Sequence, residues 1–133
     1  MNYPKTIATE NPVIHLCILG TQAEFQGRVE QACKLYLQAW DLAANDYEAC
    51  IAAHYLARFQ DDPAETLRWN REALRRADAV GDERVATFYP SLYLNMGRSH
   101  ELLGEQPEAE KYYALAAALG VVHQGEQDRY INS

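Results

Sequence analysis

Histidine and cysteine are the residues of this chain that could bind a metal ion or act as a nucleophile. The four histidines are His15, His54, His100 and His123, and the three cysteines are Cys17, Cys33 and Cys50. No two histidines have the spacing of a zinc-binding helix. The cysteines are odd in number and too widely spaced for a paired-cysteine zinc site or a disulfide framework. We therefore expect no metal centre, and free thiols in a reducing compartment.

The motifs of common enzyme active sites are absent from the sequence. It contains no Gly-x-Ser-x-Gly turn to expose a nucleophilic serine, no glycine-rich phosphate-binding loop and no calcium-binding loop. We therefore predict that the protein is not an enzyme and uses no cofactor.

A cluster of arginines invites comparison with a nucleic-acid-binding helix. Arg68, Arg71 and Arg75 recur at spacings of three and four, which places them on one side of a helix. Glu65 and Glu72 fall on the same side, where they can pair with these arginines. The pattern favours a solvated face of paired charges. The formal net charge of -7 also opposes binding to phosphate, so we expect no nucleic-acid partner.

Length and composition are those of a single globular domain. The chain has 133 residues, of which 48% are hydrophobic and 23% are charged. Its most apolar stretch, residues 13–19, is far shorter than the roughly 20 residues of a membrane-spanning helix. Residues 1–12 contain no apolar run typical of a secretory signal. We expect a cytoplasmic protein without a membrane partner.

Hydrophobic periodicity predicts an all-α fold. Apolar residues recur at spacings of three and four along most of the chain, and no stretch alternates as a β-strand does. The residues that break this pattern are Gly27, Asp61-Asp62-Pro63, Gly81-Asp82, Gly104, Pro107 and Gly120. Asp62 before Pro63 predicts a capped helix start, and Asn11 before Pro12 predicts another. Pro90 predicts a kink or a helix restart, because proline lacks the backbone amide.

One set of residue types recurs three times at matching offsets. The first copy is Leu19-Gly20, Ala23, Gly27, Ala32, Tyr36 and Ala39; the third is Met96-Gly97, His100, Gly104, Ala109, Tyr113 and Ala116; a degenerate second copy is Ala53-His54, Ala57, Asp61, Thr66, Asn70 and Ala73. The small residues at 32, 66 and 109 give separations of 34 and 43 residues. His54 and His100 fall in repeat positions, and we interpret both as packed or capped imidazoles.

These residues resemble the tetratricopeptide (TPR) family, in which Leu-Gly, alanine and aromatic positions recur about every 34 residues. The resemblance implies a right-handed stack of antiparallel helix hairpins with six helices and room for a short C-terminal helix. It also implies a tail at 1–12, repeats at 13–46, 47–81 and 82–120, and a tail or partial cap at 121–133. We expect the glycines and alanines to let paired helices approach closely, and Tyr36, Tyr113, Trp40 and Trp69 to fill the space between neighbouring hairpins.

In the TPR family the first helix of each hairpin lines a concave groove. By resemblance the groove-lining residues are Ile14, Cys17, Thr21, Glu24, Phe25, Glu48, Ile51, Tyr55, Arg58, Phe59, Ser91, Leu94, Asn95, Arg98 and Leu102. From these we select as candidate peptide contacts Thr21, Glu24, Ile51, Tyr55, Arg58, Leu94, Asn95 and Arg98. Tyr55 with Arg58 and Arg98 could hold an acidic or C-terminal segment, because arginine pairs well with carboxylates.

The sequence therefore favours a protein or peptide interaction module whose partner binds in the concave groove. Two alternatives stay open. One is an architectural subunit that forms a homodimer through its C-terminal end, where Val121 and Val122 would leave the last hairpin partly uncovered. The other is a regulatory domain that senses a short peptide.

Overall fold

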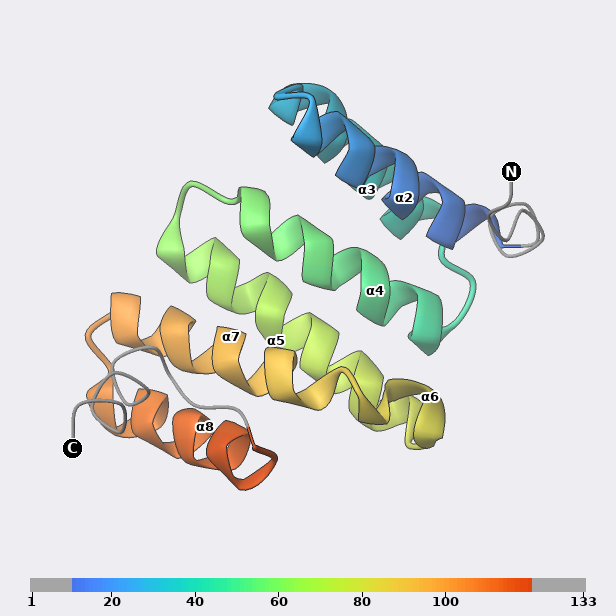
Figure 1. The fold of residues 1–133 in the computed structure, drawn as a ribbon. Coiled ribbons are helices and arrows are strands. Elements are labelled where there is room, and N and C mark those ends of the chain that lie inside the picture. Colours follow the sequence, from blue (N-terminus) through green and yellow to red (C-terminus); the bar gives the residue numbers. More distant parts are fainter. Residues whose placement is uncertain (1–10, 121–133) are drawn as a thin grey trace.

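The computed structural model describes residues 11–120, and each regular element within that range is a helix (Figure 1). The six longer helices are α2 (Pro12–Phe25), α3 (Val29–Leu42), α4 (Asp46–Leu56), α5 (Pro63–Val80), α7 (Tyr89–Leu102) and α8 (Gln106–Ala118). A 3-10 turn, η1 (Ala57–Phe59), extends α4, and a four-residue helix, α6 (Glu83–Ala86), precedes α7. The all-α prediction is confirmed for this range. The expected tails lie outside it.

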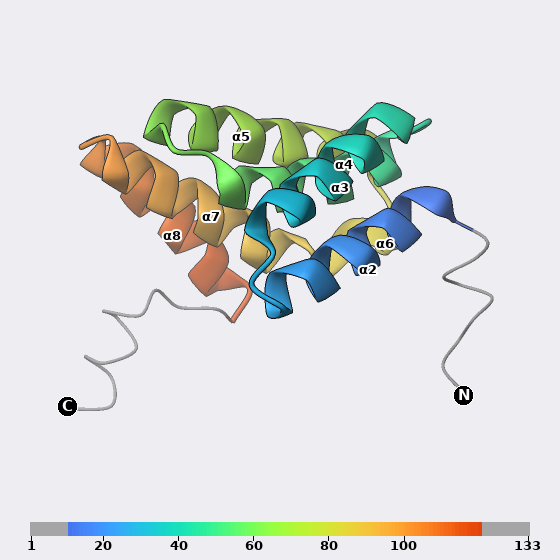
Figure 2. The same ribbon diagram turned by 90° about the horizontal axis from the view of Figure 1, so that it is seen from above.

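Consecutive long helices pair as hairpins, and the hairpins stack in chain order, as Figure 1 shows. α2 packs on α3, α4 on α5 and α7 on α8. Neighbouring hairpins meet through α3 against α4 and through α5 against α7. Figure 1 shows α4 between α2 and α7, and Figure 2 shows α2 and α7 together on the side of the stack away from α5.

The helix starts follow the signals in the sequence. The side chain of Asn11 accepts a hydrogen bond from the amide of Ile14, and that of Asp62 accepts one from Ala64. A proline occupies the first turn of each of these helices, where its missing amide costs no helical hydrogen bond. The chain also restarts near Pro90, since α6 ends at residue 86 and α7 begins at residue 89. These predictions are confirmed.

Within the outer two hairpins, the helices meet where a tyrosine ring covers a glycine. A Cβ atom added to Gly20 would lie within 3 Å of three ring atoms of Tyr36. Gly97 has the same relation to Tyr113. Each tyrosine hydroxyl also donates to a glutamate four residues after its glycine: Tyr36 to Glu24 at 2.5 Å and Tyr113 to Glu101 at 2.6 Å. The repeat is therefore a physical unit of glycine, tyrosine and glutamate.

This contact corrects part of the expected role of the tyrosines. They were expected to fill the space between hairpins, but each packs first on the glycine of its own hairpin. Tyr36 does also reach the next hairpin, where its ring stacks on Tyr55 with centroids 4.8 Å apart and contacts Phe59 at 5.5 Å. Tyr36 is fully buried by these neighbours.

The middle hairpin replaces the glycine and tyrosine with a different pair. Position 54, equivalent to Gly20, is histidine, and position 70, equivalent to Tyr36, is asparagine. A larger residue on α4 thus accompanies a smaller one on α5. The buried Asn70 donates from Nδ2 to Ser99 Oγ at 2.8 Å, which ties α5 to α7. The degenerate second repeat therefore lacks the contact of a tyrosine with a glycine that the other two repeats share.

Packing between hairpins uses the aromatic residues that the sequence indicated. Trp40 and Trp69 meet edge to face with ring centroids 5.0 Å apart, which confirms their expected place. The short helix α6, which the sequence analysis did not anticipate, buries Val85 against α5 and α7. It occupies the extra residues of the longer second repeat.

On the arginine-rich side of α5, Arg68 and Arg75 form ion pairs as predicted, whereas Arg71 forms none with the described residues. Arg68 pairs with Glu65 at 3.0 Å, and Arg75 pairs with Glu72 at 2.6 Å. Arg76 pairs with Glu72 at 2.7 Å and reaches Asp46 at the start of α4 at 2.9 Å. Each of these paired arginines thus contacts a glutamate that lies three or four residues before it on the helix.

Replacing Gly20 by alanine tests the contact between Gly20 and Tyr36, because the contact and helix propensity predict changes of opposite sign in the free energy of unfolding. Helix propensity alone predicts that Gly20→Ala stabilises the protein by about 1 kcal/mol. The clash with Tyr36 predicts instead a loss of about 1–3 kcal/mol in the free energy of unfolding, measured by urea denaturation. In a Tyr36→Leu background the same change should cost much less. A stabilised Gly20→Ala protein would show that the contact does not set the helix spacing.

Candidate peptide-binding groove

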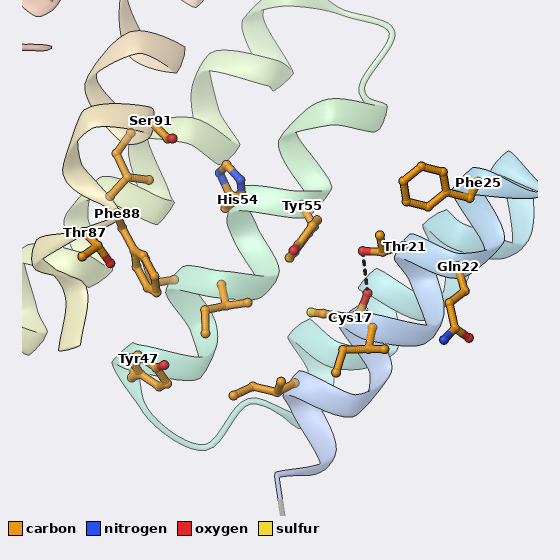
Figure 3. Close-up of a pocket in the computed structure, with 15 residues that line it drawn as sticks. Cys17, Thr21, Gln22, Phe25, Tyr47, His54, Tyr55, Thr87, Phe88 and Ser91 are labelled. Atoms are coloured by element: carbon orange, nitrogen blue, oxygen red, sulfur yellow. Dashed lines mark hydrogen bonds between the residues drawn. The ribbon is translucent and has the colours of Figure 1, made fainter. Parts of the chain in front are cut away.

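A cavity of about 630 Å³ opens between the first helices of the three hairpins. Its lining comes from α2, from α4, and from the α6–α7 connection with the first turn of α7, as the close-up in Figure 3 shows. The lining residues are Ile14, Cys17, Ile18, Thr21, Gln22, Phe25, Tyr47, Cys50, Ile51, His54, Tyr55, Thr87, Phe88, Ser91 and Leu92. A cavity of this volume lies in the range of binding sites for small ligands or several side chains.

Among residues 11–120, the lining includes no aspartate, glutamate, lysine or arginine. Aliphatic and aromatic side chains make up most of it, although the whole chain has a formal net charge of -7. Phe25 is 88% exposed at the end of α2. Phe25 thus extends the apolar lining to the rim of the cavity.

Three of the eight selected residues line this cavity. They are Thr21 from α2 and Ile51 and Tyr55 from α4. Figure 3 shows Thr21 and Tyr55 on neighbouring helices, and the Thr21 hydroxyl donates to the carbonyl oxygen of Cys17 at 3.0 Å. The first two hairpins therefore meet at the groove as their repeat positions implied.

Glu24 and Arg58 lie together just outside the cavity lining, where they pair with each other. The same glutamate accepts the hydrogen bond from Tyr36, and the Arg58 guanidinium lies 5.0 Å from the centroid of the Tyr55 ring. This network joins α2, α3 and the end of α4. The cation that was expected to hold a carboxylate of a partner already holds one of this chain.

The third hairpin contributes different residues from those selected. Leu94 and Asn95 are half-buried on α7 and Arg98 is exposed, and the cavity lining includes none of the three. Ser91, which the resemblance placed in the groove, does line the cavity, and it does so together with Thr87, Phe88 and Leu92. Because the second repeat is longer, the beginning of α7 rather than its middle faces α4.

Several polar groups of the lining have no partner within the part of the chain that the structure describes. The side chains of Gln22, Tyr47, Tyr55, Thr87 and Ser91 form no hydrogen bond with one another or with other described residues. They surround an apolar floor that includes Ile51 and Leu92. Such groups are free to bond to the main chain of a bound polypeptide or to water.

His54 is a lining residue that the sequence analysis interpreted as packed or capped. It is packed, but its Nδ1 atom is buried and has no hydrogen-bond partner. Burial lowers the pKa of His54 below its ordinary value, and the nearby positive charge of Arg58 lowers it further. The sequence does mark His54 as unusual, because it stands at the repeat position that Gly20 and Gly97 occupy in the other two hairpins.

Metal and membrane chemistry find no support in the described residues. Residues 11–120 contain no group of three or more histidine, cysteine, aspartate or glutamate side chains placed to hold a metal ion. No helix in that range has the length and apolar character needed to cross a membrane.

The two cysteines of the lining provide a test of the groove by chemical modification. Burial raises the pKa of Cys17 to about 12 and, with Asp78, that of Cys50 to about 11. At pH near 8 we expect a disulfide reagent to modify the half-buried Cys33 first, because the reactive thiolate is about a hundredfold scarcer for Cys50, and about a thousandfold scarcer for Cys17, than for an ordinary thiol. Cys33→Ser should remove the fast phase. Equal rates for all three thiols in the native protein would contradict this arrangement.

Comparisons with protein-family models, with curated proteins and with solved structures gave no match for this chain.

Proposed function

We propose that this chain is a tetratricopeptide-like interaction module whose groove binds a segment of another polypeptide. The observation that carries the proposal is the uncharged cavity of about 630 Å³ between α2, α4 and the start of α7. It has the size, the apolar walls and the scattered uncommitted hydrogen-bonding groups of a site for an extended or helical peptide. Peptide binding in the groove requires no catalytic residue and no cofactor.

The repeat gives the proposal independent support. Stacked helical hairpins have an inner face formed by their first helices, and such proteins commonly bind partners there. Here that face holds the cavity, while Arg68 and Arg75 of the arginine-rich face of α5 form ion pairs within the chain. The proposed setting is the cytoplasm, where Cys17 and Cys50 would remain reduced.

A random peptide library selected against the protein tests this function, with binding of isolated peptides measured by fluorescence anisotropy. Ser91 is exposed on the cavity wall, so Ser91→Arg places a long cation in the groove without disturbing the core. We expect peptides selected on the wild-type protein to bind the Ser91→Arg variant at least about tenfold more weakly. This corresponds to a loss of roughly 1.4 kcal/mol in binding free energy.

The matched control is Gln38→Arg, which adds the same charge on the exposed side of α3. It should bind the selected peptides as the wild-type protein does. Failure to isolate any peptide, or peptides whose affinity ignores Ser91→Arg, would rule out the groove as a polypeptide site. Arg98→Ala should have little effect, because Arg98 does not line the cavity.

A second candidate function, self-association, is favoured by the exposed apolar residues of α8, of which Leu115 and Leu119 line a hollow beside α6 and the start of α7. Leu115 is 38% exposed and Leu119 is 52% exposed, and Ala114, Ala117 and Ala118 beside them are exposed as well. Val121 and Val122, which first suggested a homodimer, lie outside the described residues. An apolar helix face at the end of a stack is a common site of association.

Sedimentation equilibrium decides this candidate. If the chain works as an architectural subunit, the wild-type protein should approach twice its 15.1 kDa mass as concentration rises. The double variant Leu115→Gln and Leu119→Gln should remain a monomer over the same range. A wild-type protein that stays monomeric throughout removes self-association and leaves the groove proposal untouched.

A further inference from the structure

His54 holds the one buried side-chain nitrogen or oxygen without a hydrogen-bond partner between residues 11 and 120, its Nδ1 atom. Buried polar atoms are nearly always paired in folded proteins, so an exception calls for an explanation. This exception lies in the wall of the cavity, near the centre of the groove on α4. A residue that only filled space there could as well be apolar.

The repeat shows that His54 is a departure from the structural pattern. The equivalent residues of the other hairpins, Gly20 and Gly97, have no side chain and lie under a tyrosine ring. In the middle hairpin the tyrosine is replaced by Asn70, whose amide nitrogen is engaged by Ser99. The departure therefore places an imidazole where the pattern of the fold places no side chain.

Because Nδ1 of His54 has no hydrogen-bond partner among the described residues, we expect the proton of the neutral ring to lie on Nε2. A buried N–H without an acceptor is rarer in proteins than a buried acceptor without a donor. The neutral ring therefore carries its proton on Nε2. That atom is not enclosed as Nδ1 is, and no described residue bonds to it. Figure 3 shows the ring of His54 on the wall formed by α4, with Tyr55 and Ser91 to either side.

We infer that His54 is the polar recognition residue of the groove, and that it donates its Nε2 proton to an uncharged oxygen, such as a main-chain carbonyl, of a bound polypeptide segment with apolar side chains. This inference rests on the proposed function and specifies its ligand. The segment is uncharged because the lining offers no opposite charge. A charged side chain would lose its water there without compensation.

Protonation of His54 is incompatible with such an occupant. A bound apolar segment removes the remaining water from the ring, which raises the cost of the imidazolium form. The pKa of His54 is therefore lower in the complex than in the free protein. Affinity is complete above the pKa of the free protein and falls as pH drops through it, by up to about tenfold per pH unit for one linked proton.

Among the described residues that line the cavity, His54 is the side chain whose charge can change as the pH falls below 7. Arg58, one turn along the same chain, stays positively charged and is held by Glu24 from α2. The thiols of Cys17 on α2 and Cys50 on α4 are neutral, because burial raises the pKa of both. The wall from α6 and α7 contributes only Thr87, Phe88, Ser91 and Leu92, and none of these side chains ionises in this range.

The test measures peptide affinity against pH. The probes are peptides of Leu, Phe, Gln and Ser with blocked ends, chosen by screening for binding near pH 7.5, together with copies in which Gln is replaced by Glu or Lys. We expect the uncharged peptides to bind best and to lose affinity for the wild-type protein as the pH falls below the ordinary histidine value of about 6.5 and through the lowered pKa of His54. His54→Gln should bind them with no dependence on pH in this range. The matched control His15→Gln, exposed on α2, should keep the wild-type profile.

The outcomes separate this inference from the proposed function. If library peptides bind in the groove but His54→Gln keeps the wild-type pH profile, or if the charged copies bind equally well, the inference is wrong and the groove remains a peptide site. If no peptide binds at any pH, the proposed function fails first. Nitrogen chemical shifts of His54 in the free wild-type protein add a test without a variant. They should report a proton on Nε2 and protonation only below about pH 6.5, and a proton on Nδ1 would overturn the inference.

Discussion

The contact of a tyrosine ring with a glycine on the facing helix determines how closely the paired helices lie. At Gly20 and Gly97 no side chain separates the backbone from the ring, so α2 approaches α3 and α7 approaches α8 at the distance that the ring thickness allows. The hydroxyl of each tyrosine then bonds to a glutamate one turn further along the first helix. Packing and a charge-assisted hydrogen bond thus fix the same geometry, which makes the spacing and the relative rotation of the helices depend on three residues.

The middle hairpin departs from this rule, and the groove lies where it departs. Because His54 takes the position of a glycine and Asn70 that of a tyrosine, α4 directs an imidazole toward the inner face while α5 holds a hydrogen bond to Ser99. Tyr36 of the first hairpin stacks on Tyr55, which positions α4 against α3. The regular outer hairpins thereby hold a less regular central one, as expected of a stack whose stability comes from its neighbours.

The sequence predicted the scaffold better than the site, for a physical reason. Helix period, the caps at Asn11 and Asp62 and the restart near Pro90 are local properties that neighbouring residues determine, and the structure follows them. The groove residues of the first two hairpins could also be predicted, since Thr21, Ile51 and Tyr55 occupy regular positions of the repeat. Of the third wall only Ser91 was predicted, because Thr87 and Phe88 belong to extra residues that have no counterpart in the other repeats. Nor could spacing alone show that Glu24 and Arg58 neutralise each other.

That ion pair determines what kind of molecule the groove can select. Had Arg58 been free, its charge would have favoured acidic segments over all others. Paired with Glu24 and packed against Tyr55, it leaves an inner face without net charge on a protein whose surface is acidic. Long-range attraction then contributes little to the groove itself, and discrimination depends on the cost of removing water from whatever enters. A neutral histidine is suited to such a surface, because it offers one directional hydrogen bond without an obligatory charge.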